Sequence, residues 1–147
     1  MRSLVVGVGN LLCSDDGVGI HVIQRLEAMK RGVETFDAAM GSIEVIEAMR
    51  GYDRAFIVDA IQSGARSGTI HVVKLSKGEV PPVLTHSHGT DIITTIQLGY
   101  RLYGAEMPKE ITLLAVEAED ITTINDRLTP NVEAAVGKVI KMILGRK

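Results

Sequence analysis

Tryptophan is absent from this sequence of 147 residues, and only two Phe and three Tyr are present. Apolar residues nevertheless make up 46% of the chain, so its core must be built from aliphatic side chains. Such side chains are typical of parallel strands, which are buried because helices cover both faces of the sheet. The composition therefore favours an α/β protein, and its length suits one domain with a full core. We expect a single domain over residues 1–147.

The chain also has only one cysteine, little net charge and no long apolar run. The one cysteine, Cys13, excludes a disulfide within the chain and is typical of a reducing compartment. A net charge of −2 offers no basic surface for nucleic acid or for an anionic membrane. No apolar run reaches the length of a membrane span, and the chain opens with a strand pattern instead of a signal segment. These absences predict a cytoplasmic protein whose macromolecular partner is another protein.

Short aliphatic strand patterns alternate with helical patterns along the chain. The strand patterns cover residues 3–8, 33–36, 55–58, 69–75 and 111–116. The helical patterns cover residues 17–30, 42–49, 91–103 and the stretch that Thr129 caps and Pro130 begins. The turn at residues 64–68 is too short for a crossover helix, so the strand after it should be antiparallel. The sequence predicts a three-layer α/β/α sandwich, with a mostly parallel five-stranded sheet and one antiparallel strand.

A glycine turn that carries two acids follows the first expected strand. It reads Gly7-Val8-Gly9-Asn10-Leu11-Leu12-Cys13-Ser14-Asp15-Asp16-Gly17-Val18-Gly19. A strand, a glycine turn and a helix also make up the dinucleotide-binding motif. Asp15 and Asp16 argue against that function, because they would repel the phosphate that the N-terminus of a helix attracts. Carboxylates at this place suit a cation instead. A nucleotide- or phosphate-binding module stays an alternative, since Asp37 closes the second strand as such a module requires.

Acids also end the second and third expected strands, at Asp37 and Asp59. The carboxyl ends of parallel strands meet at one edge of the sheet, where ligands bind in open α/β folds. His88 lies on a loop before a helix and can reach the same edge. Two carboxylates and an imidazole form a ligand set that suits nickel, zinc or a similar divalent ion. We therefore consider Asp16, Asp59 and His88 as one site.

Each candidate also has a purely structural interpretation. Asp15 has the residue type of a helix cap, and Asp16 that of a solvated acid in the first turn. Asp59 is harder to explain in this way, because a carboxylate beside a buried strand needs a partner. Histidines on loops, such as His86 and His88, are usually exposed.

Other reactive side chains do not form a recognisable catalytic pattern. Cys13 lies beside two acids, without the neighbouring base that a nucleophilic thiol needs, so we assign it no catalytic role. We interpret His21, within a helix, and His71, within a strand, as structural. Neither a Gly-x-Ser-x-Gly nor a His-Glu-x-x-His motif is present.

The residues match a family pattern over nearly the whole chain. Gly7-x-Gly9-Asn10-x-Leu12-x-x-Asp15-Asp16-Gly17-x-Gly19 closely resembles the signature of the hydrogenase maturation endopeptidases, the nickel-dependent processing proteases of [NiFe] hydrogenases. Weaker matches follow in the right order: Val58-Asp59-Ala60, Ser87-His88, Val116-Glu117 and Leu128-Thr129-Pro130. The sequence departs from the family after the second strand, where it reads Asp37-Ala38-Ala39-Met40-Gly41, and at Ala118, where a Pro is usual.

The resemblance implies a function and a site. Such enzymes remove a C-terminal extension from the hydrogenase large-subunit precursor once nickel has been inserted. Family nickel ligands match Asp16, Asp59 and His88, with His86 as a rival for the histidine. The nickel would arrive with the substrate, either to take part in cleavage or only to be recognised. A chaperone that senses nickel on the precursor without cutting it is the remaining alternative.

Overall fold

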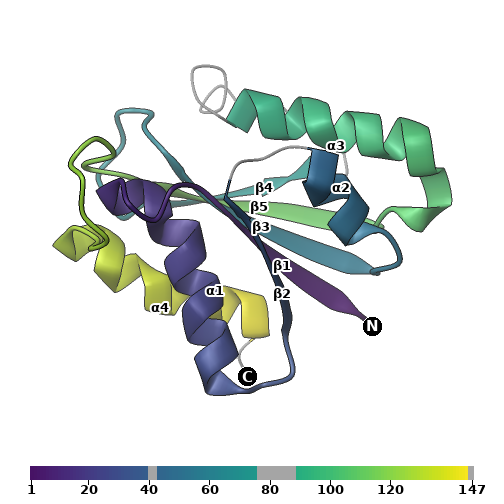
Figure 1. Ribbon diagram of the computed structural model, residues 1–147, viewed down its shortest axis with the longest axis horizontal. Coiled ribbons are helices and arrows are strands. Elements are labelled where there is room, and N and C mark those ends of the chain that lie inside the picture. Colours follow the sequence, from purple (N-terminus) through teal and green to yellow (C-terminus); the bar gives the residue numbers. More distant parts are fainter. Residues whose placement is uncertain (40–42, 76–88, 146–147) are drawn as a thin grey trace.

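A computed structural model describes residues 1–39, 43–75 and 89–145 of the chain (Figure 1). In these residues five strands form one sheet in the order β2-β1-β3-β5-β4. They are β1 (Ser3–Val8), β2 (Glu34–Ala39), β3 (Arg54–Ile61), β4 (Ile70–Lys74) and β5 (Glu110–Glu117). All neighbours pair in parallel except β4, which runs antiparallel to β5 at the edge. The prediction of a mostly parallel sheet with one antiparallel strand is confirmed.

Helices cover both faces of the sheet. They are α1 (Val18–Met29), α2 (Ile43–Met49), α3 (Gly89–Tyr103) and α4 (Pro130–Leu144), with short 3-10 turns η1 (Ser14–Gly17) and η4 (Gly104–Glu106). Figure 1 shows α1 and α4 on one face and α2 and α3 on the other. Each face has its own core cluster, and both are almost entirely aliphatic, as the scarcity of aromatic residues predicts. The three-layer α/β/α prediction is therefore confirmed. Among the described residues, no helix is both long enough and apolar enough to cross a membrane.

The chain order places a switch point between β1 and β3. From β1 the chain passes through α1 to β2 on one side, and then through α2 to β3 on the other side. Connections that diverge in this way leave a crevice at the carboxyl ends of the two strands, where ligands of α/β proteins bind. The turn that contains Asp15 and Asp16 lies at this edge.

Glycines allow the turn and α1 to approach the strands closely. A Cβ atom on Gly19 would lie 2.3 Å from the carbonyl oxygen of Val58 in β3. Gly9 has a φ of +134°, and a Cβ atom there would lie 1.9 Å from the carbonyl oxygen of Asp16. Both positions therefore exclude any side chain. The glycines that resemble a phosphate-binding loop serve here to pack backbone against backbone beside two acids.

Two strands extend further than their sequence patterns predict. The second pattern ends at residue 36, whereas β2 continues to Ala39 past a register shift in its pairing with β1. The third pattern ends at residue 58, whereas β3 continues to Ile61. The extension of β3 pairs with the last three residues of β5, so Asp59 lies inside the strand and opposite Ala115. A buried carboxylate is therefore held on a backbone that pairs with β5 beyond the end of the pairing with β1.

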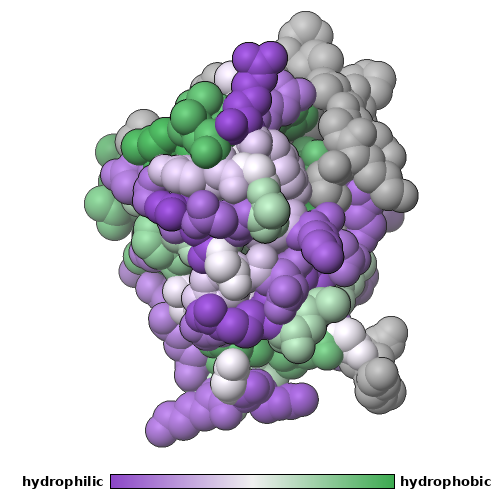
Figure 2. Space-filling view, turned by 90° about the vertical axis from the view of Figure 1, so that its right-hand side faces the viewer, coloured by the Kyte–Doolittle hydropathy of each residue, from purple (hydrophilic) through white to green (hydrophobic). Residues whose placement is uncertain are grey.

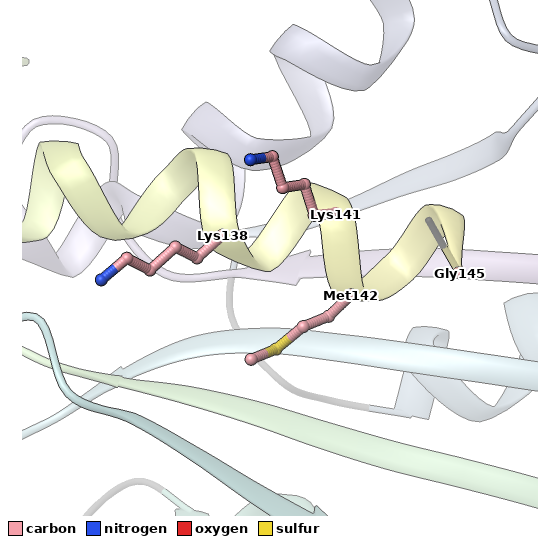
Figure 3. A pocket seen from close by; sticks show the side chains of 4 residues that line it. All are labelled: Lys138, Lys141, Met142 and Gly145. Carbon is pink, nitrogen blue, oxygen red and sulfur yellow. The ribbon is translucent and has the colours of Figure 1, made fainter. Parts of the chain in front are cut away.

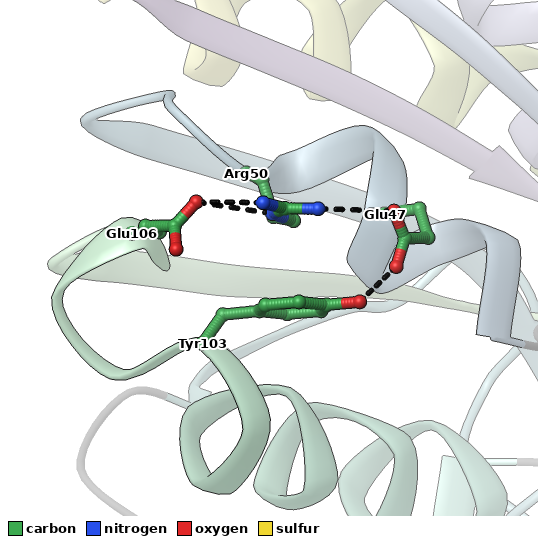
Figure 4. Close-up of polar contacts among 4 residues, drawn as sticks. All are labelled: Glu47, Arg50, Tyr103 and Glu106. Carbon is green, nitrogen blue, oxygen red and sulfur yellow. Dashed lines mark hydrogen bonds and ion pairs between the residues drawn. The ribbon is translucent and has the colours of Figure 1, made fainter.

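A polar cluster connects the two helices on the upper face of Figure 1. The Arg50 guanidinium contacts Glu47 at 3.3 Å and Glu106 at 2.8 Å, and lies 4.2 Å from the centre of the Tyr103 ring (Figure 4). The Tyr103 hydroxyl donates a hydrogen bond to Glu47. These side chains are largely exposed, so the cluster orients α2 against the end of α3 and adds little stability.

Asp15 is a buried anchor for three segments. Its carboxylate accepts hydrogen bonds from the backbone N–H groups of Glu119, Asp120 and Thr129, at 2.9, 3.1 and 2.8 Å, and from the Thr129 hydroxyl at 2.7 Å. The turn after β1 is thus tied to the loop after β5 and to the start of α4. Asp15 does not cap α1, whose N-cap residue is Gly17. Thr129 occupies the predicted N-cap position of α4, but its hydroxyl binds Asp15 instead of its own helix.

We expect Asp15→Ala to lower the free energy of unfolding by about 3 kcal/mol or more, because buried N–H groups would lose a charged acceptor. Urea denaturation followed by circular dichroism measures the change. The matched control is Asp126→Ala, which removes an exposed acid from the same loop. Equal unfolding midpoints for the two variants would show that Asp15 is not an anchor.

Candidate functional site

Two carboxylates lie at the carboxyl edge of the sheet, at the switch point. Asp16 is half-buried in η1, and its Oδ2 atom accepts a hydrogen bond of 2.9 Å from the backbone N–H of Asn10. Asp59 is only 5% exposed, near the end of β3, and its Oδ1 atom accepts a hydrogen bond of 2.8 Å from the backbone N–H of Ala60. The structure therefore brings together two of the three predicted ligands.

The surroundings of Asp59 disfavour a negative charge on its carboxyl group. Burial raises the pKa of Asp59 from 3.8 to about 8; the Ala60 N–H opposes this rise, and the negative charge of Asp16 adds to it. Without a cation, the carboxyl group of Asp59 is therefore mostly protonated at neutral pH. A divalent cation between Asp16 and Asp59 would supply the positive charge that the proton supplies otherwise. A buried carboxyl group with a raised pKa is a candidate for a functional site.

The predicted third ligand, His88, and its rival, His86, lie outside the described residues. In the sequence His88 directly precedes α3, which begins at Gly89. Among the described residues, no group of three or more His, Cys, Asp or Glu side chains is placed to hold a metal ion. The assignment of His88 stays a prediction.

Asp37, which the sequence places at the end of the second strand, lies inside β2 and supports the neighbouring loop. It is exposed, and its Oδ1 atom accepts a hydrogen bond of 2.9 Å from the backbone N–H of Ala39. Ala39 has a φ of +50°, and its carbonyl accepts a hydrogen bond of 2.8 Å from the N–H of Gly9. Asp37 thus stabilises the turn that holds the glycine segment in place.

A second buried acid, Glu117, belongs to a structural cluster. It lies at the end of β5 and is 1% exposed. Its carboxylate accepts hydrogen bonds from the backbone N–H of Ser63 at 2.7 Å and from the Ser63 hydroxyl at 2.6 Å. Its Oε1 atom also lies 3.0 Å from Nε2 of His71. Burial acts to raise the pKa of Glu117, but the bonds from Ser63 and His71 outweigh it and lower the pKa below its ordinary value. The cluster fixes the connection between β3 and β4 against β5.

Sequence reasoning identified Glu117 through the family resemblance and His71 as structural, but did not pair them. They meet because of the antiparallel register of β4 on β5, which places Ile70 opposite Val116. That register depends on tertiary pairing and has no local sequence signal. His21, the other histidine expected to be structural, lies with Nε2 2.9 Å from the carbonyl oxygen of Asp126.

Other surfaces of the described structure offer no comparable chemistry. A hollow on the outer side of α4 is lined by Lys138, Lys141, Met142 and Gly145, and Figure 3 shows the two lysine side chains pointing apart. Figure 2 shows the side of the molecule at the right of Figure 1, where hydrophilic residues cover much of the described surface and hydrophobic ones form smaller groups. Neither surface brings acids together as the carboxyl edge does.

Comparisons of sequence identify the family. The model of the hydrogenase maturation protease family matches residues 20–146. Hydrogenase 2 maturation protease of Escherichia coli (strain K12) is 30% identical to this chain, over 98% of it and 89% of that protein. A putative hydrogenase maturation protease of Methanocaldococcus jannaschii is also 30% identical, over 97% of this chain and 94% of that protein.

Solved structures show the same fold. An endopeptidase from Escherichia coli, solved in solution, has a TM-score of 0.79 and 30% identity, over 99% of this chain and 91% of that one. A [NiFe] hydrogenase maturation protease, HybD from Thermococcus kodakarensis, has a TM-score of 0.80 at 22% identity, over 99% and 98%. The family model spans the larger part of the sequence, and relatives of similar length align from end to end. This chain therefore belongs to the hydrogenase maturation protease family.

Proposed function

We propose that this protein is the endopeptidase that removes the C-terminal extension of a [NiFe] hydrogenase large-subunit precursor after nickel insertion. The observation that carries the proposal is the buried carboxyl of Asp59 beside Asp16 at the switch point of the sheet. Membership of the family gives the reaction class, a hydrolase that acts in hydrogenase maturation. The electrostatics of the pair support a site for a divalent cation.

The nickel would be part of the substrate. Asp16, Asp59 and His88 would supply three ligands, which leaves positions open for ligands that the precursor brings. In the absence of the ion, Asp59 keeps a proton, so the free enzyme has little charge with which to retain a metal of its own. Binding the nickel of the precursor would release that proton. The enzyme would thus respond to a precursor that is already loaded.

Each ligand has a distinct role in this chain. The Asn10 N–H fixes one oxygen of Asp16, and the neighbouring glycines bring Asp16 close to the ends of β1 and β3. Asp59 is held by a strand that pairs with β5 and is itself shielded from solvent. A bound nickel ion would polarise the scissile carbonyl or activate a water molecule, as divalent ions do in other hydrolases.

The structure argues against one of the two alternatives, and family membership disfavours the other. A phosphate group at the turn after β1 would lie next to the Asp16 carboxylate, which argues against a nucleotide- or phosphate-binding module. A nickel-sensing chaperone would use the same three ligands without cleavage. One experiment separates these functions: incubation of the protein with nickel-loaded precursor, followed by mass spectrometry of the large subunit. Loss of the C-terminal extension supports the endopeptidase, and an intact mass in a stable complex supports the chaperone.

We expect Asp16→Ala and His88→Ala to abolish processing of nickel-loaded precursor while the melting temperature changes little, because Asp16 belongs to neither core cluster and His88 directly precedes α3 in the sequence. The control is Leu4→Ala, which deletes buried volume in β1, where Leu4 is 3% exposed. This change should cost roughly 2–5 kcal/mol of stability and leave processing intact at low temperature. Full activity of the Asp16/Asp59 double alanine variant, or efficient cleavage of nickel-free precursor, would contradict the proposal.

Asp59 also predicts a pH dependence of stability in the metal-free protein. Between its pKa of 3.8 in the unfolded chain and about 8 in the folded chain, only the folded state keeps the proton. Stability should therefore fall as the pH rises through this window, with a contribution from Asp59 of up to about 1.4 kcal/mol per pH unit, and level off above it. Urea denaturation from pH 5 to pH 8 should show a shallower fall for Asp59→Asn, whose amide does not titrate. If stability falls equally steeply with pH in the unaltered protein and in Asp59→Asn, the pKa of Asp59 is not raised by folding.

A further inference from the structure

Two exposed aliphatic side chains lie beside the carboxylate site. Leu12, in the turn after β1, is 60% exposed, and Ile124, in the loop after β5, is 84% exposed. The two segments pair through their backbones: the Asn125 N–H donates to the Leu12 carbonyl at 3.0 Å, and the Ser14 N–H donates to the Asn125 carbonyl at 3.0 Å. Figure 1 shows the two loops side by side at the carboxyl edge.

The pairing brings the two residues next to each other. Cys13 forms a parallel bridge with Asn125, and Leu12 and Ile124 directly precede this bridge on the two segments. The hydrogen bond from the Asn125 N–H to the Leu12 carbonyl therefore joins the backbone of Leu12 to the residue that follows Ile124. We call these two side chains the apolar pair. Large apolar side chains that are exposed next to one another mark interaction sites more often than isolated ones do.

The position of the apolar pair is fixed relative to the site. The Asp16 N–H donates a hydrogen bond of 3.1 Å to the carbonyl of Cys13, which follows Leu12. Asp15 holds the other segment through the N–H groups of Glu119 and Asp120. The surface is therefore formed before any partner arrives, so that little entropy would be lost in ordering it.

We propose that the apolar pair docks an apolar stretch of the large-subunit precursor next to its cleavage point. This inference rests on the proposed function. A precursor whose nickel reaches Asp16 must pass close to Leu12, because both residues belong to the same turn. Glu119 and Asp126 are exposed acids in the same loop as Ile124 and disfavour an acidic segment, so the docked stretch is apolar. The apolar pair would supply binding energy that a set of three metal ligands does not.

Steady-state cleavage of nickel-loaded precursor tests the proposal through Leu12→Ser and Ile124→Ser. Each change removes one large apolar contact, so we expect KM to rise roughly tenfold while kcat at saturation is unchanged. The matched control is Leu102→Ser on α3, since Leu102 is 56% exposed and lies near the C-terminal end of that helix. It should leave KM unchanged. Melting temperatures of all three variants should match the unaltered protein, because the substituted side chains are exposed.

Parallel binding measurements keep this test separate from that of the function. The affinity for nickel-loaded precursor is measured by biolayer interferometry, and it should weaken by the same factor in Leu12→Ser and Ile124→Ser. If the unaltered protein binds but does not cleave, the proposed function fails while the docking surface is still tested. If it cleaves and both serine variants keep its KM and affinity, the docking inference is wrong. The docking inference is also wrong if light scattering shows that the unaltered protein is a dimer and that the only effect of the serine variants is to make it a monomer. A second copy of the chain would then occupy the surface.

Discussion

Four hydrogen bonds to the carboxylate of Asp15 hold together the end of the molecule at which we place function. They join the turn after β1 to the loop after β5 and to the residue before α4, both of which lie more than a hundred residues further along the sequence. Asp16 follows Asp15 directly, and the loop that Asp15 holds carries Ile124. Without this anchor, neither Asp16 nor the apolar pair would have a defined place relative to Asp59. The position of the site thus depends on an acid that takes no part in its chemistry.

Three buried carboxylates in the described structure differ in how their charge is compensated. Asp15 and Glu117 each receive several hydrogen bonds, from backbone and hydroxyl donors and, for Glu117, from a histidine. Asp59 is nearly as buried, yet among the described residues the hydrogen bond that it accepts comes from its own neighbour, Ala60. The pKa of Glu117 is lowered and that of Asp59 is raised to about 8. A compensated carboxylate stabilises the fold, whereas an uncompensated one is a candidate for a functional role.

The sequence predicts those features that depend on local pattern. Aliphatic runs and short turns predict the sheet, its antiparallel strand and the two aspartates at its carboxyl edge. The function of Asp15 could not be predicted in this way, because its partners Glu119 and Thr129 come from distant segments and have no sequence signal. The continuation of β3 through Asp59 was missed for a related reason. An acid predicts the end of a strand, but pairing with β5 holds the backbone in place beyond it.

The choice between adjacent acids shows how function depends on environment. Asp15 and Asp16 are identical in type and one residue apart, and local pattern makes Asp15 a helix cap and Asp16 a solvated acid. The turn of η1 directs Asp15 toward donors in the core and leaves Asp16 half-buried near a second carboxylate. Burial raises the pKa of Asp59 and the charge of Asp16 adds to that rise, so Asp59 keeps a proton in the empty site. Nickel carried by a partner protein would replace that proton, so the environment that disfavours the charge of Asp59 would respond to the loaded precursor.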